Sequence, residues 1–104
     1  MSFAINGGFH EADHLWQFGL SGEIDISNAS QLKTRLESAY SETPADIVLD
    51  LGNLNYIDST GLGVIIGVYG GIKENGHRII LREPKENVKK LLRITSLDKV
   101  LCGE

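Results

Sequence analysis

Two segments near the start of the chain alternate between apolar and polar residues, which is the pattern of half-buried β-strands. The first, residues 3–9, contains two successive glycines that weaken it and favour a place at a sheet edge. The second, residues 14–20, places Trp16, Phe18 and Leu20 on one face, which we expect to enter the core. An acidic turn separates the two segments, so together they predict an antiparallel hairpin.

Longer apolar periods follow. Residues 28–40 carry apolar side chains at helical spacing and predict an amphipathic helix, preceded by several candidate caps at 26–28. Residues 47–51 are short and almost wholly apolar, which predicts a strand covered on both faces. The following Gly-Asn-Leu-Asn, residues 52–55, reads as a turn.

Residues 61–73 are apolar nearly all round and predict a largely buried helix. Gly63 and Gly67 share one face of it, and we expect that face to approach the sheet closely. Asn75-Gly76 should end the helix.

The rest of the chain repeats the alternation of strand and helix. Residues 78–82 predict a strand, and Pro84 suits the first turn of a following helix. A final short apolar segment, residues 97–101, should pack against the core.

The order of these segments predicts an α/β fold in a single domain, residues 1–104. Two successive strand–helix–strand units imply right-handed crossovers and parallel neighbours, and the opening hairpin adds an antiparallel pair. We therefore expect a mixed β-sheet with helices packed on it. A chain of 104 residues is long enough for one domain and too short for two.

The net charge of the chain bears on whether its partner is a nucleic acid. The net charge is −4 and the pI is about 5.3, so we expect no nucleic-acid partner. One basic cluster stands out at helical spacing. It is either a solvated helix face or a phosphate-binding patch, and consists of Lys85, Lys89, Lys90 and Arg93.

Nothing in the sequence indicates a membrane, a metal or a cofactor. No apolar run approaches the ~20 residues that span a bilayer, and the N-terminus lacks the features of a signal peptide. The three histidines and Cys102 have no ligand spacing, and a single cysteine cannot form an internal disulfide. We expect a cytoplasmic protein with no metal, cofactor or membrane partner.

The most informative segment is 56–63, Tyr-Ile-Asp-Ser-Thr-Gly-Leu-Gly, between a predicted strand and a predicted helix. Free backbone N–H groups at such a junction can receive an anion. Ser59 is either a phosphorylation site or, like Thr60, an ordinary helix cap. Gly61 either lets a partner backbone approach the serine or relieves crowding between helix and sheet. Asp58 either orients the serine, or a metal–nucleotide held by a kinase, or is an acid favoured at a helix start.

Three segments carry a resemblance to a known family: Leu-Ser-Gly-Glu-Ile-Asp at 20–25, Asp-Ile-Val-Leu-Asp-Leu at 46–51, and the segment 56–63. In this order and spacing the chain resembles the STAS-domain anti-sigma factor antagonists of bacteria. A weaker match runs through 88–100. The resemblance covers roughly residues 3–102 and implies a single STAS domain.

The resemblance implies a partner-switching protein with no catalytic activity of its own. Unphosphorylated, such a protein binds an anti-sigma factor that is also a serine kinase, and a sigma factor is released. The kinase uses ATP to phosphorylate the serine that follows the motif aspartate, here Ser59, and the complex separates. A PP2C-type phosphatase then removes the phosphate.

The resemblance also implies a partner-binding surface around the serine. It contains Glu23 and Asp25, which read alone are only turn acids, together with Asp58, Thr60, Gly61 and Gly63. Family members commonly carry a longer C-terminal helix than this chain, so we expect the contacts of that helix to be reduced.

Two other functions remain open. The same fold serves as a phosphorylation-independent scaffold or adaptor subunit in signalling and lipid-transport complexes. A more remote alternative is an enzyme with Ser59 as nucleophile, which needs a nearby base and an oxyanion hole. The histidines, His10, His14 and His77, stand near turns or strand ends, and no Gly-x-Ser-x-Gly elbow is present.

Overall fold

The two alternating segments form the expected antiparallel hairpin in the computed structural model, which describes residues 2–101. They are β1 (Phe3–His10) and β2 (Leu15–Ile24), joined by a tight turn. The predicted hairpin is therefore confirmed, although β2 runs four residues beyond the predicted end.

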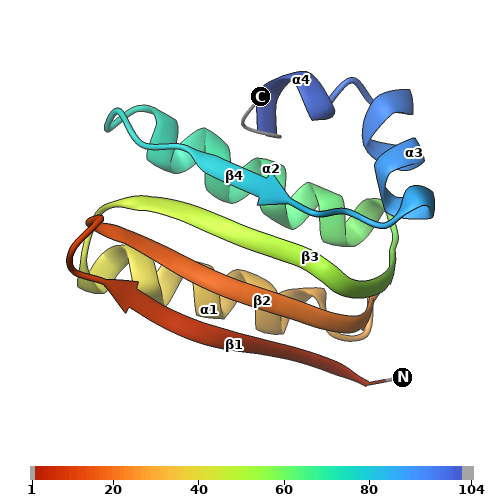
Figure 1. Cartoon of the computed structure of the whole chain (residues 1–104), viewed down its shortest axis with the longest axis horizontal. Helices are drawn as coiled ribbons and strands as arrows, with labels where there is room; N and C mark the ends of the chain where they lie inside the picture. Colours follow the sequence, from red (N-terminus) through yellow and green to blue (C-terminus); the bar gives the residue numbers. More distant parts are fainter. Residues whose placement is uncertain (1, 102–104) are drawn as a thin grey trace.

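The sheet has the order β1-β2-β3-β4, in which β3 (Asp46–Ile57) and β4 (Ile79–Arg82) continue parallel to β2. The helices α1 (Ala29–Glu42) and α2 (Ser59–Lys73) connect these strands and lie on the same face of the sheet (Figure 1). Two right-handed crossovers taken in the same direction produce this arrangement. The predicted mixed sheet with packed helices is confirmed.

The opposite face of the sheet carries no helix in the described part of the chain (Figure 1), and the prediction that residues 47–51 are covered on both faces is wrong at Asp50, although Val48 on the same face is buried. Ile47 and Leu49 point toward the helices and are fully buried, whereas Asp50 is exposed. Val48 lies between its strand neighbours Gln17 and Ile80 and is buried among them. The apolar run at residues 47–51 is therefore explained by the central position of β3 between β2 and β4.

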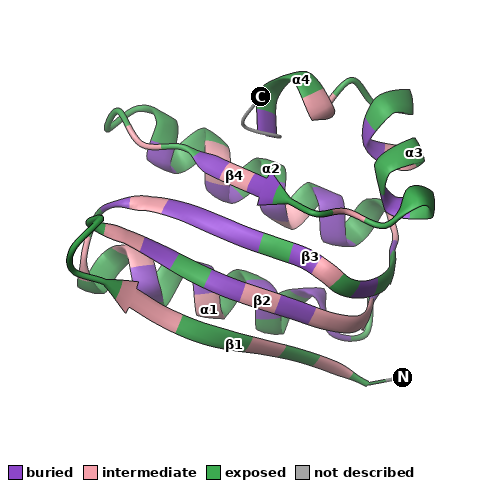
Figure 2. Ribbon diagram, in the orientation of Figure 1, coloured by how far each residue is buried: buried purple, intermediate pink, exposed green. Residues whose placement is uncertain are grey.

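The core fills the space between the sheet and the helices α1 and α2 (Figure 2). Trp16, Phe18 and Leu20 are at most 5% exposed, as the alternation predicted. The indole Nε1 of Trp16 donates a hydrogen bond to the carbonyl of Thr43 at 2.9 Å, which satisfies its one polar group. The aromatic face of β2 is thus part of the core.

β3 is much longer than the sequence predicts. Residues 52–55 continue the strand to Ile57 instead of forming a turn. Leu54 is fully buried and pairs with Gly22 of β2, and this cross-strand packing outweighs the poor strand propensity of the glycine and asparagines around it. The pairing register of β2 with β3 shifts twice in this region, between Gly19 and Ser21 and between Gly22 and Glu23. The two strands nevertheless end paired, Ile24 with Ile57.

α2 buries only one side, so the prediction of a largely buried helix is wrong for its outer face. Gly63 and Gly67 are exposed, and a Cβ on either would meet no atom within 4 Å. The expected close approach of these two glycines to the sheet is therefore also wrong. Gly76 has a φ of 83° just beyond the helix, as the predicted stop requires.

The last helices, α3 (Glu86–Ile94) and α4 (Asp98–Leu101), lie beside β4 (Figure 1). Pro84 precedes the N-cap Lys85, so it lies outside the first turn where the sequence placed it. In the final apolar segment Leu101 is buried, whereas Val100 is 52% exposed. Cys102 lies outside the described residues.

Candidate functional site

The predicted site residues come from two segments, 23–25 and 58–63, which meet at the carboxyl ends of β2 and β3. The last two residues of β2 pair with the last two of β3, and the backbone N–H of Asp58 donates to the carbonyl of Ile24 at 3.1 Å. Glu23 and Asp25 therefore lie beside Asp58 and Ser59 at one edge of the sheet. Both α1 and α2 begin at this edge, as Figure 1 shows.

Asp58 is the N-cap of α2. Its backbone is extended, and its Oδ1 accepts a hydrogen bond from the N–H of Gly61 at 3.0 Å. The interpretation of Ser59 or Thr60 as the cap is therefore wrong. The ionised side chain also places negative charge at the positive end of the helix dipole, where it is favoured.

Ser59 is the first residue of α2 and is exposed, as is Thr60. The N–H groups in the first turn of a helix have no partners within the helix, and the Asp58 carboxylate satisfies only that of Gly61. A phosphate on the Ser59 Oγ would meet the remaining donors and the helix dipole, worth ~0.3–1 kcal/mol. Asp58 would oppose it by charge. The junction can therefore accept a phosphate with α2 intact.

Gly61 is buried where α2 crosses the ends of β2 and β3. A Cβ here would lie 2.7 Å from Cγ1 of Ile57 and 2.8 Å from Cγ2 of Ile24. Relief of crowding between helix and sheet thus accounts for this glycine. The close approach that it allows fixes the position of Ser59 above the strand ends.

Gly63 and Thr60 line a shallow groove of about 350 Å³ between α1 and α2. Val64 and Gly67 of α2 also line this groove. Because the glycines carry no side chains, the backbone of α2 is accessible from this side. Gly63 therefore leaves the backbone of α2 open at this groove, and a partner contact there stays a prediction.

Asn28 organises the loop between β2 and α1, although the sequence marked it only as a candidate cap. It is 6% exposed. Its Oδ1 accepts from the N–H of Asp25 at 3.0 Å, and its Nδ2 donates to the carbonyl of Glu23 at 2.9 Å. The side chain makes no cap hydrogen bond to α1. Asn28 therefore positions the two acids beside Ser59.

Asp25 is held in its charged form by the same loop. The hydroxyl and the backbone N–H of Ser27 both donate to its Oδ1. These hydrogen bonds hold the pKa of Asp25 below its ordinary value. With Asp58, the loop presents fixed negative charge next to the serine.

Two exposed apolar side chains adjoin these acids along the chain. Ile26, next to Asp25, is 80% exposed, and Tyr56, at the end of β3, is 45% exposed. Tyr56 also lines a hollow of about 280 Å³ with Leu91 and Ile94 of α3. Ile26 and Tyr56 are therefore candidates for apolar contact with a partner. The sequence did not predict a role for Ile26, for which the one signal was a large apolar residue in a polar loop.

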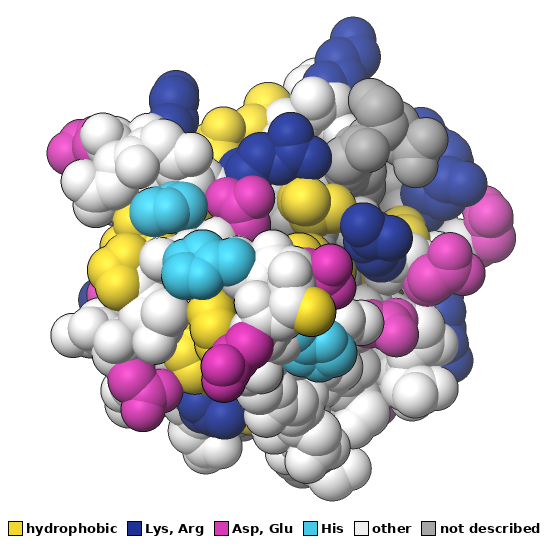
Figure 3. All heavy atoms as spheres, turned by 60° about the vertical axis from the view of Figure 1, so that its left-hand side comes forward, with side chains coloured by type: hydrophobic (Ala, Val, Ile, Leu, Met, Phe, Trp, Pro, Cys, Tyr) yellow, Lys and Arg dark blue, Asp and Glu magenta, His cyan; other side chains and the backbone are white. Residues whose placement is uncertain are grey.

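The histidines lie at the other end of the sheet. His10 pairs with Leu15, whose partner is Asp46 at the start of β3, and the Arg78 N–H next to His77 donates to the Asp46 carboxylate. Figure 3 shows histidine side chains on this face. Since β3 has 12 residues, on the order of 30 Å separates this end from Ser59. No histidine there can act as a base for a Ser59 nucleophile.

Within residues 2–101, no group of histidine, cysteine and acidic residues has the arrangement of a metal site. No helix in this part of the chain has the length and apolar character needed to cross a membrane.

Comparison with known proteins agrees with this geometry. The model of the STAS domain family matches residues 9–102. A Bacillus subtilis (strain 168) protein named anti-sigma-B factor antagonist is 34% identical over 97 residues, which cover 93% of this chain and 88% of that protein.

Solved structures share the fold. A crystal structure of an anti-sigma factor antagonist from Mycobacterium paratuberculosis has a TM-score of 0.80 at 26% identity, covering 96% of this chain and 83% of that one. The Bacillus cell fate determinant SpoIIAA, solved in its phosphorylated form, has a TM-score of 0.69 at 19% identity, with coverages of 96% and 88%. With the family model spanning most of its length, the chain belongs to the STAS domain family, among the anti-sigma factor antagonists.

Proposed function

We propose that this chain is a partner switch that binds an anti-sigma factor with serine kinase activity while Ser59 is unmodified. Binding releases a sigma factor, and phosphorylation of Ser59 dissociates the complex. One observation carries the proposal: an exposed serine stands first in α2, directly after the capping Asp58, at the edge that also holds Glu23 and Asp25. The name of the Bacillus subtilis relative supports the class of partner.

In this mechanism the partner supplies ATP and this chain supplies the hydroxyl. The Ser59 oxygen attacks the γ-phosphorus, the bond to the β-phosphate oxygen breaks, and ADP leaves while the hydroxyl proton passes to the kinase or solvent. A PP2C-type phosphatase hydrolyses the phosphoserine and restores the binding form. The cycle takes place in the cytoplasm and needs neither nucleic acid nor a membrane as a direct partner of this chain.

The phosphate acts on the complex more than on the fold. It adds about −1.5 to −2 charges at pH 7 next to Asp58 and near Asp25. A partner surface that covers Ile26 and Tyr56 would also desolvate the Ser59 side chain. A complete switch, from about 99% bound to about 1% bound, requires ~5.5 kcal/mol of differential affinity. Desolvation of a dianion among fixed carboxylates is a sufficient source of this energy.

Intact-mass measurement after incubation with ATP and the serine-kinase anti-sigma factors of the source organism tests the proposal. The unmodified chain and Thr60→Ala should each gain one phosphate, and Ser59→Ala should gain none. Thr60 is the matched control because its hydroxyl is exposed one residue away. A phosphate that persists in Ser59→Ala would refute the site.

Binding distinguishes the switch from a scaffold. Ser59→Ala should hold the kinase permanently, and Ser59→Asp should weaken the complex. Equal affinity of the two variants would instead identify a phosphorylation-independent adaptor.

A further inference from the structure

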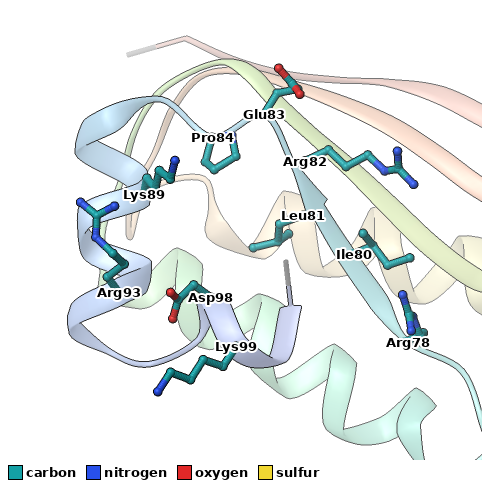
Figure 4. A pocket seen from close by; sticks show the side chains of 10 residues that line it. All are labelled: Arg78, Ile80, Leu81, Arg82, Glu83, Pro84, Lys89, Arg93, Asp98 and Lys99. Carbon is teal, nitrogen blue, oxygen red and sulfur yellow. The ribbon is translucent and has the colours of Figure 1, made fainter. Parts of the chain in front are cut away.

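A further hollow lies along the side of β4 that faces away from β3. It is separate from the carboxyl ends of β2 and β3, where Ser59 lies. Its volume is about 840 Å³. Figure 4 shows the side chains that line it. Residues of β4 and the turn after it form one wall, and α3 and α4 supply the others. The proposed switch makes no use of this hollow.

The hollow follows the backbone edge of β4. Ile80 and Leu81 point to opposite faces of the sheet because successive strand residues alternate, yet both line the hollow. The carbonyl of Arg78 accepts from the N–H of Ile47 in β3. By the same alternation, Ile79 and Leu81 direct their N–H and C=O groups away from β3. Among residues 2–101 no strand pairs with this edge.

The lining is strongly basic. Five cationic side chains face two acidic ones, a local charge of +3 in a chain whose total is −4. The cations lie in β4 or directly before it, in α3 and in α4, and are Arg78, Arg82, Lys89, Arg93 and Lys99. The acids are Glu83 and Asp98.

Two simpler explanations cover only parts of this arrangement. Charged residues on an edge strand prevent aggregation, which accounts for Arg82 in β4 and Arg78 directly before it. A solvated helix face accounts for basic residues on α3, but these side chains separate in space: Lys85 donates to Asn55, and Lys90 lines the hollow beside Tyr56. Neither explanation requires Lys89, a strand arginine and Lys99 of α4 to converge on one edge.

We propose that this edge binds an extended, acidic segment of a partner protein by strand addition to β4. The outward N–H and C=O groups of Ile79 and Leu81 would pair with the segment backbone, and its carboxylates would meet the arginines and lysines. Four strand residues at ~3.3 Å each give room for a segment of about four or five residues. Since Ser59 is not part of this surface, the contact persists in both phosphorylation states.

A defined peptide pair tests the proposal on the full chain. The probe is an acetylated hexapeptide of alternating glutamate and valine, and its control carries lysine in place of glutamate. Titration into the ¹⁵N-labelled protein should shift the amide signals of Ile79 and Leu81 most strongly. The double variant Lys89→Glu/Arg93→Glu should weaken binding about tenfold. Lys90→Glu, a charge reversal on the other flank of α3, should leave the affinity within about twofold.

Three results would overturn the proposal. Equal affinity for the lysine peptide would remove the charge argument. Inorganic phosphate that produces the same shifts at the same concentrations would show a simple anion site. Binding only after removal of residues 102–104, which lie outside the described part, would make the chain's own end the occupant. Shifts that are unchanged in a Ser59-phosphorylated sample would support an anchor independent of the switch.

Discussion

Replacing Gly61 by alanine should destabilise the protein, whereas the same replacement at Gly67 should stabilise it. Both residues lie within α2, where alanine exceeds glycine by up to ~1 kcal/mol; position 67 is in the helix interior and takes the full gain, whereas position 61 is in the first turn and takes at most that. The two positions differ in their surroundings. A methyl group at 61 meets Ile57 and Ile24 at 2.7 and 2.8 Å, whereas at 67 it meets nothing within 4 Å.

The free-energy cost of crowding at position 61 can be estimated from these contacts. Ile24 and Ile57 are at most 4% exposed and β-branched, so neither can move aside freely. Overpacking of a filled core costs typically 1–3 kcal/mol. Because position 61 gains at most the helix propensity that position 67 gains, the difference in stability between the two variants is at least this cost. We expect Gly61→Ala to be ~1–3 kcal/mol less stable than Gly67→Ala, about 4–8 °C in Tm for each kcal/mol.

Urea unfolding followed by circular dichroism measures both variants under the same conditions. Unchanged m-values would show that the difference belongs to the native state. If Gly61→Ala is as stable as Gly67→Ala, the close contact between α2 and the strand ends is wrong, and with it the explanation of how Ser59 is positioned. A backbone shift confined to residues 58–62 in Gly61→Ala would connect the crowding to the site directly.

Three further predictions concern the loop beside the serine. Ile26→Glu should weaken kinase binding by about tenfold or more with unchanged stability, whereas Val100→Glu, at another exposed apolar position, should leave binding unchanged in the same calorimetric titration. Asn28→Ala should lower the free energy of unfolding by about 1–3 kcal/mol, measured by urea titration, because it leaves two loop backbone groups unpaired; no loss would mean that water replaces the amide. Ser27→Ala should raise the pKa of Asp25 toward its ordinary value, followed by carboxyl NMR. Since the folded pKa is depressed, the stabilisation from this carboxylate is present above its ordinary pKa and is lost as pH falls through the folded pKa. An unchanged titration would remove Ser27 as the cause.

The sequence was sufficient for the sheet because its signals are local. Alternation at Trp16, Phe18 and Leu20, and apolar periods in the helices, each depend on a few neighbouring residues. The turn predicted at 52–55 failed because its composition is turn-like, while the packing of Leu54 against β2 depends on a partner about 30 residues away. Pairing between distant segments is not visible in a local pattern.

In the site, too, local sequence signals were sufficient for some features, and others depended on contacts between distant segments. Adjacent acid and hydroxyl residues, Asp58, Ser59 and Thr60, all suit an N-cap, and only the backbone direction at the end of β3 decides that Asp58 takes the role. Similarly, helical periodicity cannot tell that Gly61 faces isoleucines while Gly63 faces solvent. The placement of Glu23 and Asp25 beside the serine came from the resemblance, and parallel pairing of β2 with β3 gives it a physical basis.

The most direct test of the switch is the affinity of the purified kinase anti-sigma factor for two forms of this chain, unmodified and fully phosphorylated on Ser59, by isothermal calorimetry. We expect the phosphorylated form to bind far more weakly, by on the order of 10⁴-fold for a complete switch. Its thermal unfolding should stay close to that of the unmodified form, since the start of α2 accepts the phosphate. Equal affinities of the two forms would contradict the proposed function.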